Sequence, residues 1–163
     1  MKKQTIELMI ATPEGLFRAC YSDEGLSGLN FPEGRARRRC AGAPAPRKIR
    51  HWHRATASAL KAVLAGREPK RLPPLATEGT EFRKSVWEQL RKLRRGETKS
   101  YGQIAAAIGR PAAVRAVGGA CGANPIPVLV PCHRVVAANG KAGGFSGGME
   151  WKRKLLAREG VRI

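Results

Sequence analysis

A thiol, an imidazole and a guanidinium follow one another within an apolar stretch, at Cys132, His133 and Arg134. The stretch, residues 128–136, is rich in valine and typical of a buried strand. A strand has no packing reason to carry three polar groups, because each costs free energy when buried without partners. Pro131 has no N–H to donate and interrupts strand pairing just before the thiol. The pattern predicts that a strand ends at Cys132 and that the chain turns there into a pocket.

The chemistry that these side chains offer is nucleophilic attack by sulfur. The thiolate is the nucleophile, and a nearby His and Arg both favour the anion. Neighbours in a strand point to opposite faces, so contact between Cys132 and His133 requires either a bend in the backbone or a bridging water. The alternative is a structural cysteine, since free cysteine is often buried simply to fill space.

The chain of 163 residues has a strongly positive charge. It has 31 Lys and Arg against 12 Asp and Glu, a formal net charge of +19, which indicates a polyanionic partner. Its hydrophobic content of 42% is ordinary for a globular protein. No apolar run approaches the length of a membrane span, and no signal peptide precedes residue 10. We therefore expect a cytoplasmic, monomeric protein that does not bind membranes.

The cysteines form neither a C-x-x-C pair nor a disulfide framework, and we expect them to be reduced. They are Cys20, Cys40, Cys121 and Cys132. Cys40 could be combined with His51 and His53 into a metal cluster, but this spacing is not a strong ligand signature. The sequence therefore predicts no metal site.

The first part of the chain alternates in short runs. Residues 5–10 and 15–20 flank a turn and predict a hairpin, and residues 25–31 add a third strand to a small antiparallel sheet. Residues 35–50 are basic and rich in Pro and Ala, which indicates an exposed loop.

A helix and a linker follow. Apolar residues recur at helical spacing over residues 51–65, and Gly66 can end a helix that covers the sheet. Three prolines lie within residues 67–79, as is common in a connection between two parts. We expect an α/β N-terminal domain over residues 1–78 and a mainly α C-terminal domain over residues 79–163.

The C-terminal part predicts a helix-turn-helix motif. Thr80 can cap a helix that ends at Gly96. A short capped helix covers residues 100–109, and Pro111 opens another helix through Ala120.

The second helix of this motif lacks the side chains that read bases. Arg115 is its only long cation among alanines, glycines and valines, which favours contact with DNA without sequence reading. The alternative is an Ala-rich buried helix with one exposed Arg. The glycine-rich residues 143–148 form a loop that allows close approach of a ligand but lacks the Gly-Lys-Ser/Thr of a phosphate loop.

Four motifs in order resemble the O6-alkylguanine-DNA alkyltransferases, also called methylated-DNA-protein-cysteine methyltransferases. The resemblance is continuous over about residues 80 to 160, and in the first 78 residues it rests only on the order of elements. The motifs are Asn124-Pro125-Ile126-Pro127, Pro131-Cys132-His133-Arg134-Val135, Phe145-Ser146-Gly147-Gly148 and Leu155-Leu156-Ala157-Arg158-Glu159-Gly160. The resemblance implies an RNase-H-like α/β N-terminal domain, a winged helix-turn-helix C-terminal domain with the active cysteine, and no cofactor.

The resemblance also implies roles for single residues. Cys132 is the alkyl acceptor, and Asn124, His133 and Glu159 form the hydrogen-bond network that makes its thiolate, so we expect a lowered pKa for this thiol. Tyr101 aids rotation of the nucleotide and donates a proton to the guanine. The expected DNA-binding residues are Arg115, which replaces the flipped base, Tyr101, Ala116, Gly118 and Arg134. The expected base pocket is formed by Pro127, Val135, Phe145, Ser146 and Gly147. The family often has tyrosine where this chain has Phe145, so a hydroxyl contact is absent at that position.

The expected partner is double-stranded DNA that contains O6-alkylguanine, bound without sequence preference and repaired in a single turnover. Such repair requires the base to leave the duplex and enter a pocket. One rival is a non-enzymatic DNA-binding helix-turn-helix protein with a structural Cys-His pair. Another is a thiol hydrolase, but nothing in the sequence resembles an oxyanion loop for acyl transfer.

Overall fold

The computed structural model describes residues 4–33 and 44–163. Its first element is an antiparallel sheet in the order β1-β2-β3, made of Ile6–Thr12, Gly15–Ser22 and Gly25–Asn30. Thr12 pairs with Gly15, so the first hairpin has the predicted tight turn. The predicted three-stranded sheet is confirmed.

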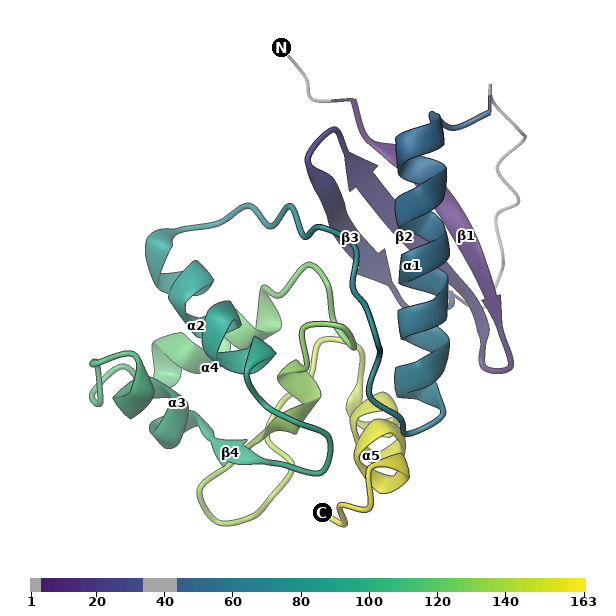
Figure 1. Ribbon diagram of the computed structural model, residues 1–163. Helices are drawn as coiled ribbons and strands as arrows, with labels where there is room; N and C mark the ends of the chain where they lie inside the picture. The colour runs from purple at the N-terminus through teal and green to yellow at the C-terminus, as the bar shows by residue number, and fades with distance from the viewer. Residues whose placement is uncertain (1–3, 34–43) are drawn as a thin grey trace.

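Helix α1, Arg47–Leu64, lies across one face of this sheet (Figure 1). It begins four residues before the predicted start, so the expectation of a loop as far as residue 50 is wrong; residues 35–43 of that loop, and Cys40, lie outside the described residues. Arg and Lys are good helix formers, and Ile49 adds buried apolar surface to the first turn. The buried face of α1 consists of Ile49, Thr56, Ala59, Leu60, Val63 and Leu64.

The segment that follows α1 is attached to the sheet. Leu75 forms a parallel bridge with Leu26 of β3. The amide of Leu26 donates to the carbonyl of Pro74, and the amide of Ala76 donates to the carbonyl of Leu26, both at 2.8 Å. The predicted connection therefore runs along the edge of the sheet. The domain boundary near residue 78 remains a prediction.

Three helices form the next layer: α2 (Glu81–Arg91), α3 (Tyr101–Ala107) and α4 (Val114–Gly122). The Thr80 side chain caps α2 by accepting a hydrogen bond from the amide of Arg83. Ser100 and Gln103 form a capping box at α3. Helix α4 starts three residues after Pro111, so the prediction that this proline opens the helix is wrong.

The stretch before the thiol is not a strand. The amide of Val130 donates to the carbonyl of Ile126 in a turn, and Cys132–Arg134 form one 3-10 turn, η1. The only strand here is β5, Val135–Val136, which pairs in parallel with β4, Lys99–Ser100. Three prolines within residues 125–131 explain the difference, because they cannot donate to a strand ladder.

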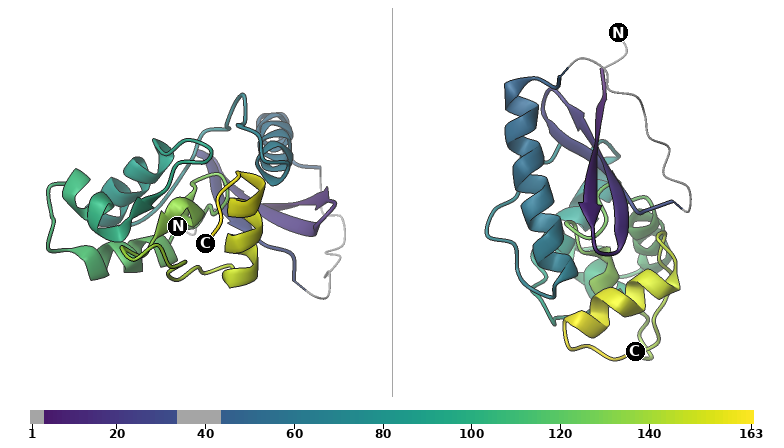
Figure 2. Two further views of the ribbon diagram at one scale, coloured as in Figure 1. Left: turned by 90° about the horizontal axis from the view of Figure 1, so that it is seen from below. Right: turned by 90° about the vertical axis from the view of Figure 1, so that its right-hand side faces the viewer.

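Helix α5, Met149–Arg158, closes the fold beside the lower end of α1 (Figures 1 and 2). Aromatic rings join the sheet to this helix. The Phe31 ring centroid lies 4.9 Å from that of Trp151 and 5.8 Å from that of Phe145, and Phe17 also packs on Trp151. The buried core is one continuous cluster that includes residues of both parts of the chain. In the described part of the chain, no helix combines the length and apolar character needed to cross a bilayer.

Candidate active site

A pocket of about 920 Å³ opens between α4, the start of α3 and the loop that precedes α5. The thiol of Cys132 lies in its wall. Six of the predicted site residues line it: Tyr101, Arg115, Gly118, Cys132, Phe145 and Ser146. The expected pocket beside Cys132 is therefore present, although a 3-10 turn positions the thiol and not the end of a strand.

The thiol of Cys132 is almost fully buried, with 3% of its surface exposed. Burial raises the pKa of this thiol, against the opposing effects of a hydrogen bond from Asn124 and the charge of Lys152. The expectation of a lowered pKa is thus wrong for the protein alone, because desolvation outweighs the nearby donors. Asn124 also fixes the turn, since its side-chain amide donates to the carbonyl of Val130 at 2.8 Å and its Oδ1 accepts from the amide of Ile126 at 3.0 Å.

His133 is fully buried and faces Glu159, with 3.0 Å between Nε2 and Oε1. Burial alone would raise the pKa of Glu159, but hydrogen bonds from His133 and Arg134 outweigh it and bring the pKa to about 2. The carboxylate is therefore ionised and accepts, so Nε2 of His133 carries the proton and Nδ1 has the free lone pair. Burial lowers the pKa of His133 despite Glu159. Nδ1 has no hydrogen-bond partner within residues 4–33 and 44–163.

Arg134 was expected on the DNA-binding surface, and this expectation is wrong. Only 4% of its surface is exposed. Its Nη2 donates to Oε1 of Glu159 at 2.8 Å, and its Nη1 donates to the carbonyl of Leu93 at 2.6 Å. The guanidinium holds the carboxylate that faces His133.

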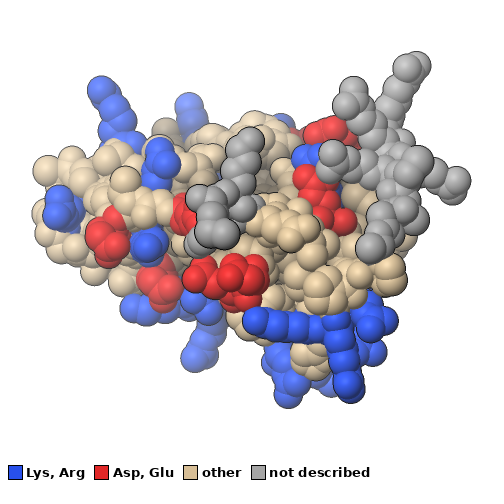
Figure 3. Space-filling view, turned by 90° about the horizontal axis from the view of Figure 1, so that it is seen from above, with Lys and Arg blue, Asp and Glu red and all other residues tan. Residues whose placement is uncertain are grey.

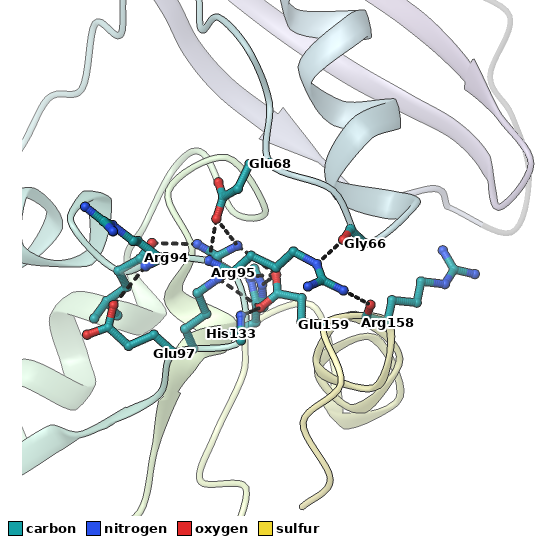
Figure 4. A network of polar contacts seen from close by, with 11 residues as sticks. Gly66, Glu68, Arg94, Arg95, Glu97, His133, Arg158 and Glu159 are labelled. Atoms are coloured by element: carbon teal, nitrogen blue, oxygen red, sulfur yellow. Dashed lines mark hydrogen bonds and ion pairs between the residues drawn. The ribbon is translucent and has the colours of Figure 1, made fainter.

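A network of polar contacts extends from Glu159 to the first part of the chain (Figure 4). Arg95 donates to the carbonyl of Gly66 and, through its amide, to Glu68. Its Nη2 also donates to the carbonyl of Arg158 at 3.3 Å. Arg158 in turn pairs with Glu14 at the tip of the first hairpin. The site is therefore braced by residues from both sides of the linker.

Tyr101 forms another wall of the pocket. Its hydroxyl donates to the carbonyl of Gly144 at 3.3 Å. Burial raises the pKa of Tyr101, and the nearby thiols Cys121 and Cys132 add to this effect. The phenol therefore remains protonated at neutral pH and can act as a proton donor.

Two residues that the sequence analysis did not select belong to the site. Lys152 of α5 is fully buried, and its Nζ donates to the carbonyl of Val135 at 2.6 Å and to that of Gly144 at 3.1 Å. Its spacing of three and four residues from the buried Leu155 and Leu156 was a signal that could have shown its burial. Cys121 of α4 lines the pocket, and burial raises its pKa to about 12.

The other predicted residues occupy different positions. Pro127 and Val135 are buried and are not among the pocket-lining residues. Ala116 is exposed on α4. Gly147 faces the Phe31 ring so closely that a Cβ there would lie 2.4 Å from Cε2 of the ring, so a larger residue at position 147 would have to displace that ring.

Residues suited to a metal ion do not gather in the described ranges, where no three His, Cys, Asp or Glu side chains form a possible ligand group. His53 is used in packing: its Nδ1 lies 2.9 Å from the hydroxyl of Tyr21.

Comparisons with known proteins agree with this geometry. Residues 81–161 match the family model "6-O-methylguanine DNA methyltransferase, DNA binding domain". The chain is 41% identical over 149 residues to the methylated-DNA--protein-cysteine methyltransferase of Methanosarcina acetivorans, which covers 91% of this chain and 94% of that protein. It is 53% identical over 88 residues to the protein of that name from Salmonella typhimurium, but this match spans only 52% of the Salmonella protein.

A solved structure has the same fold. The crystal structure of Mycobacterium tuberculosis OGT in complex with DNA has a TM-score of 0.75 to this chain and 37% sequence identity, and the match covers 93% of this chain and 90% of that one. Because the similarity extends over both parts of the molecule and includes the segment that holds the buried thiol, the chain belongs to the methylated-DNA–protein-cysteine methyltransferase family.

Proposed function

We propose that the protein repairs O6-alkylguanine in duplex DNA by transferring the alkyl group to Cys132. The observation that carries this proposal is the position of Cys132 in the wall of a pocket that α4 borders, with Arg115 of that helix also lining it. A base in a stacked duplex cannot reach a buried thiol, so the nucleotide has to rotate out of the helix and enter the pocket. Arg115, which is exposed, would fill the space that the base leaves.

The proposed reaction is a direct displacement. Nδ1 of His133, which has no partner in the described part of the chain, takes the thiol proton through a bridging water, and the sulfur attacks the alkyl carbon. The bond between that carbon and O6 breaks, its electron pair goes to the guanine, and Tyr101 supplies a proton to the guanine. The proton held by His133 restores the phenol, so the products are a thioether at Cys132 and unmodified guanine.

The pKa values of the resting site give an order of events. The thiol is protonated in the free protein because burial raises its pKa, while Lys152 and Asn124 stabilise the anion once it forms. Proton transfer to His133 therefore belongs to the reaction with bound DNA. Glu159 and Arg134 fix the imidazole with Nδ1 as the acceptor.

The C–S bond of the thioether at Cys132 is stable because a thiolate is a poor leaving group, so each protein molecule acts once.

The finer architecture that we propose is an RNase-H-like N-terminal domain over residues 1–78 and a winged helix-turn-helix domain over residues 79–163. The sheet with α1 supports the first assignment, and α3, α4 and the short β4-β5 pair support the second.

The test is the intact mass of the protein after mixing with a duplex that contains one O6-methylguanine. We expect a gain of one methyl group per protein, located at Cys132, and no product beyond one equivalent. Cys132→Ala should not react. Cys121→Ala is the matched control, because it removes the other thiol of the same pocket and should still react.

The rival, a DNA-binding regulator with a structural Cys-His pair, predicts that the duplex binds without any change in mass. Methyl transfer by Cys132→Ala, or release of more than one equivalent of repaired base, would contradict the proposed mechanism.

A further inference from the structure

The exposed side of α1 carries a row of basic side chains that the repair reaction does not use. Arg47, Arg50, His51, Arg54 and Lys61 are all exposed, and we call these five residues the α1 stripe. At 100° per residue they fall within about 100° of the helix circumference, directly opposite the face that packs on the sheet. Figure 3, which looks down on the molecule from above, shows Lys and Arg side chains gathered at this side.

The stripe carries no compensating negative charge. The 18 residues of α1 include no Asp or Glu. Within the described ranges, no member of the stripe forms an ion pair with a carboxylate. Lys48, which points away from the stripe, donates to the carbonyl of Asp23 and covers the Trp52 ring. The charge of the stripe is therefore available to a partner.

Two hollows along the stripe provide room for anionic groups. One, of about 470 Å³, is lined by Arg47, Arg50, His53 and Arg54. The other, of about 390 Å³, is lined by residues of α1 and of the linker, including Arg54, Ser58, Lys70 and Arg71. Arg54 is shared by both hollows, and neither is lined by a carboxylate among the described residues. The first hollow is lined by arginines, and the second by cations and the Ser58 hydroxyl. Both sets of donors fit the oxygens of a phosphate.

The dimensions suit a nucleic-acid backbone. Arg47 and Lys61 are 14 residues apart, which is roughly 21 Å along a helix, or about six base pairs of a duplex. The second hollow extends the basic surface sideways onto the linker. An anionic membrane fits less well, because helices that bind membranes also bury an apolar face in the lipid. The apolar face of α1 is already packed on the sheet.

The stripe lies apart from the pocket. Helix α1 lies at the opposite end of the molecule from α3 and α4, as both views of the ribbon agree (Figures 1 and 2). We propose that the α1 stripe is a second binding surface for duplex DNA, independent of the lesion, so that one protein molecule holds two DNA segments. This inference goes beyond the repair reaction but assumes the DNA binding of the proposed function.

The test uses two short duplexes with different fluorophores, one with O6-methylguanine and one undamaged. We expect the parent protein to make the two colours diffuse together, in a complex whose native mass corresponds to one protein and two duplexes. The triple variant Arg50→Gln, Arg54→Gln, Lys61→Gln should bind the second duplex roughly tenfold or more weakly. The slope of log affinity against log salt concentration should also become shallower, by about 0.9 for each lost phosphate contact. Gln preserves helix propensity.

The matched control neutralises three exposed cations at α2, by Arg83→Gln, Arg91→Gln and Lys92→Gln. It should retain the complex with two duplexes. Loss of this complex in both triple variants would show an effect of net charge alone, and equal retention in both would show that the stripe does not bind DNA. Either outcome overturns the proposal, as does a parent protein that never binds a second duplex.

The last experiment uses anionic phospholipid vesicles. If the parent binds them through the same three cations even with excess undamaged duplex present, the surface is a membrane site and the proposal is wrong. Intact mass is read from the same samples. If Cys132 is methylated normally but no second duplex binds, only this inference is contradicted. If Cys132 is not methylated, the proposed function is contradicted.

Discussion

Glu159 connects the stability of the protein to pH. Its pKa of about 2 lies below the ordinary value of 4.5, so the ionised carboxylate stabilises the folded state above about pH 4.5. This contribution, on the order of 3 kcal/mol, is lost as the pH falls from 4.5 toward 2. We predict that Glu159→Gln flattens this part of the stability curve, as measured by urea unfolding at neutral pH and near pH 3. An unchanged pH dependence in the variant would show that other carboxylates dominate acid unfolding.

Glu159→Gln should also slow alkyl transfer. The amide can present an N–H to Nε2 of His133, which favours the tautomer with the proton on Nδ1 and removes the base for the thiol. We predict a loss of roughly tenfold or more in the single-turnover rate. A parent-like rate across neutral pH would limit Glu159 to a structural role.

Lys152 is the charge that faces the buried thiol. Because its ammonium lowers the pKa of Cys132, Lys152→Met should move the pH-rate profile for the free base O6-benzylguanine toward higher pH. The deficit should be largest at neutral pH and shrink at alkaline pH. Lys154→Met is the matched control, since Lys154 lies over the Trp151 ring on the same helix. A loss of equal size at every pH would indicate that Lys152 only holds the carbonyls of Val135 and Gly144.

At the scale of elements, Arg115 of α4 has two possible roles: it replaces the flipped base, or it only contacts a phosphate. If Arg115 replaces the flipped base, Arg115→Ala should slow repair of a matched duplex most, and a mismatch opposite the lesion should restore part of the rate because it lowers the unpairing cost of a few kcal/mol. The rate with the free base should not change. Single-turnover rates at saturating protein test this, and an equal proportional loss on matched duplex, mismatched duplex and single strand would make Arg115 an ordinary phosphate contact.

Elements with local signals were predictable from the sequence. The Thr80 cap and the Ser100 capping box mark the starts of α2 and α3 through contacts within one turn. The prediction of a strand over residues 128–136 was wrong. Valines favour strands, but the prolines around them prevent the hydrogen-bond ladder that a strand needs. Val128 even adopts a φ of 75° there, a region that valine rarely enters. Only the surrounding structure can impose it.

The site was predictable to the extent that its residues are adjacent in sequence or matched the family motifs. The burial of Arg134 was not, because it depends on Glu159 and Leu93, which are distant along the chain. The predicted direction of the pKa shift of Cys132 was wrong for the same reason. The donors near the thiol are visible in the sequence, but its burial in the folded chain is not.

At the scale of the whole molecule, Phe31 links the sheet to the pocket wall. Its ring packs on Phe145 and Trp151, so Phe31→Ala should destabilise the fold by about 2–4 kcal/mol and slow reaction with the free base by loosening Phe145. Phe82→Ala is the matched control, since Phe82 is a half-buried ring on α2. Urea unfolding and single-turnover rates measure both effects. Equal rates for the two variants would show that the sheet supports the fold and not the pocket.

The burial of Cys132 has a consequence for the time before any lesion is met. A protein that acts once has to keep its thiol intact until then, and peroxides attack the exposed thiolate form of cysteine. With 3% of its surface exposed and its pKa raised by burial, Cys132 has little of that form and little contact with solvent. The same desolvation that delays ionisation thus preserves the thiol in storage, and the number of unoxidised copies in a cell sets how many lesions it can still repair.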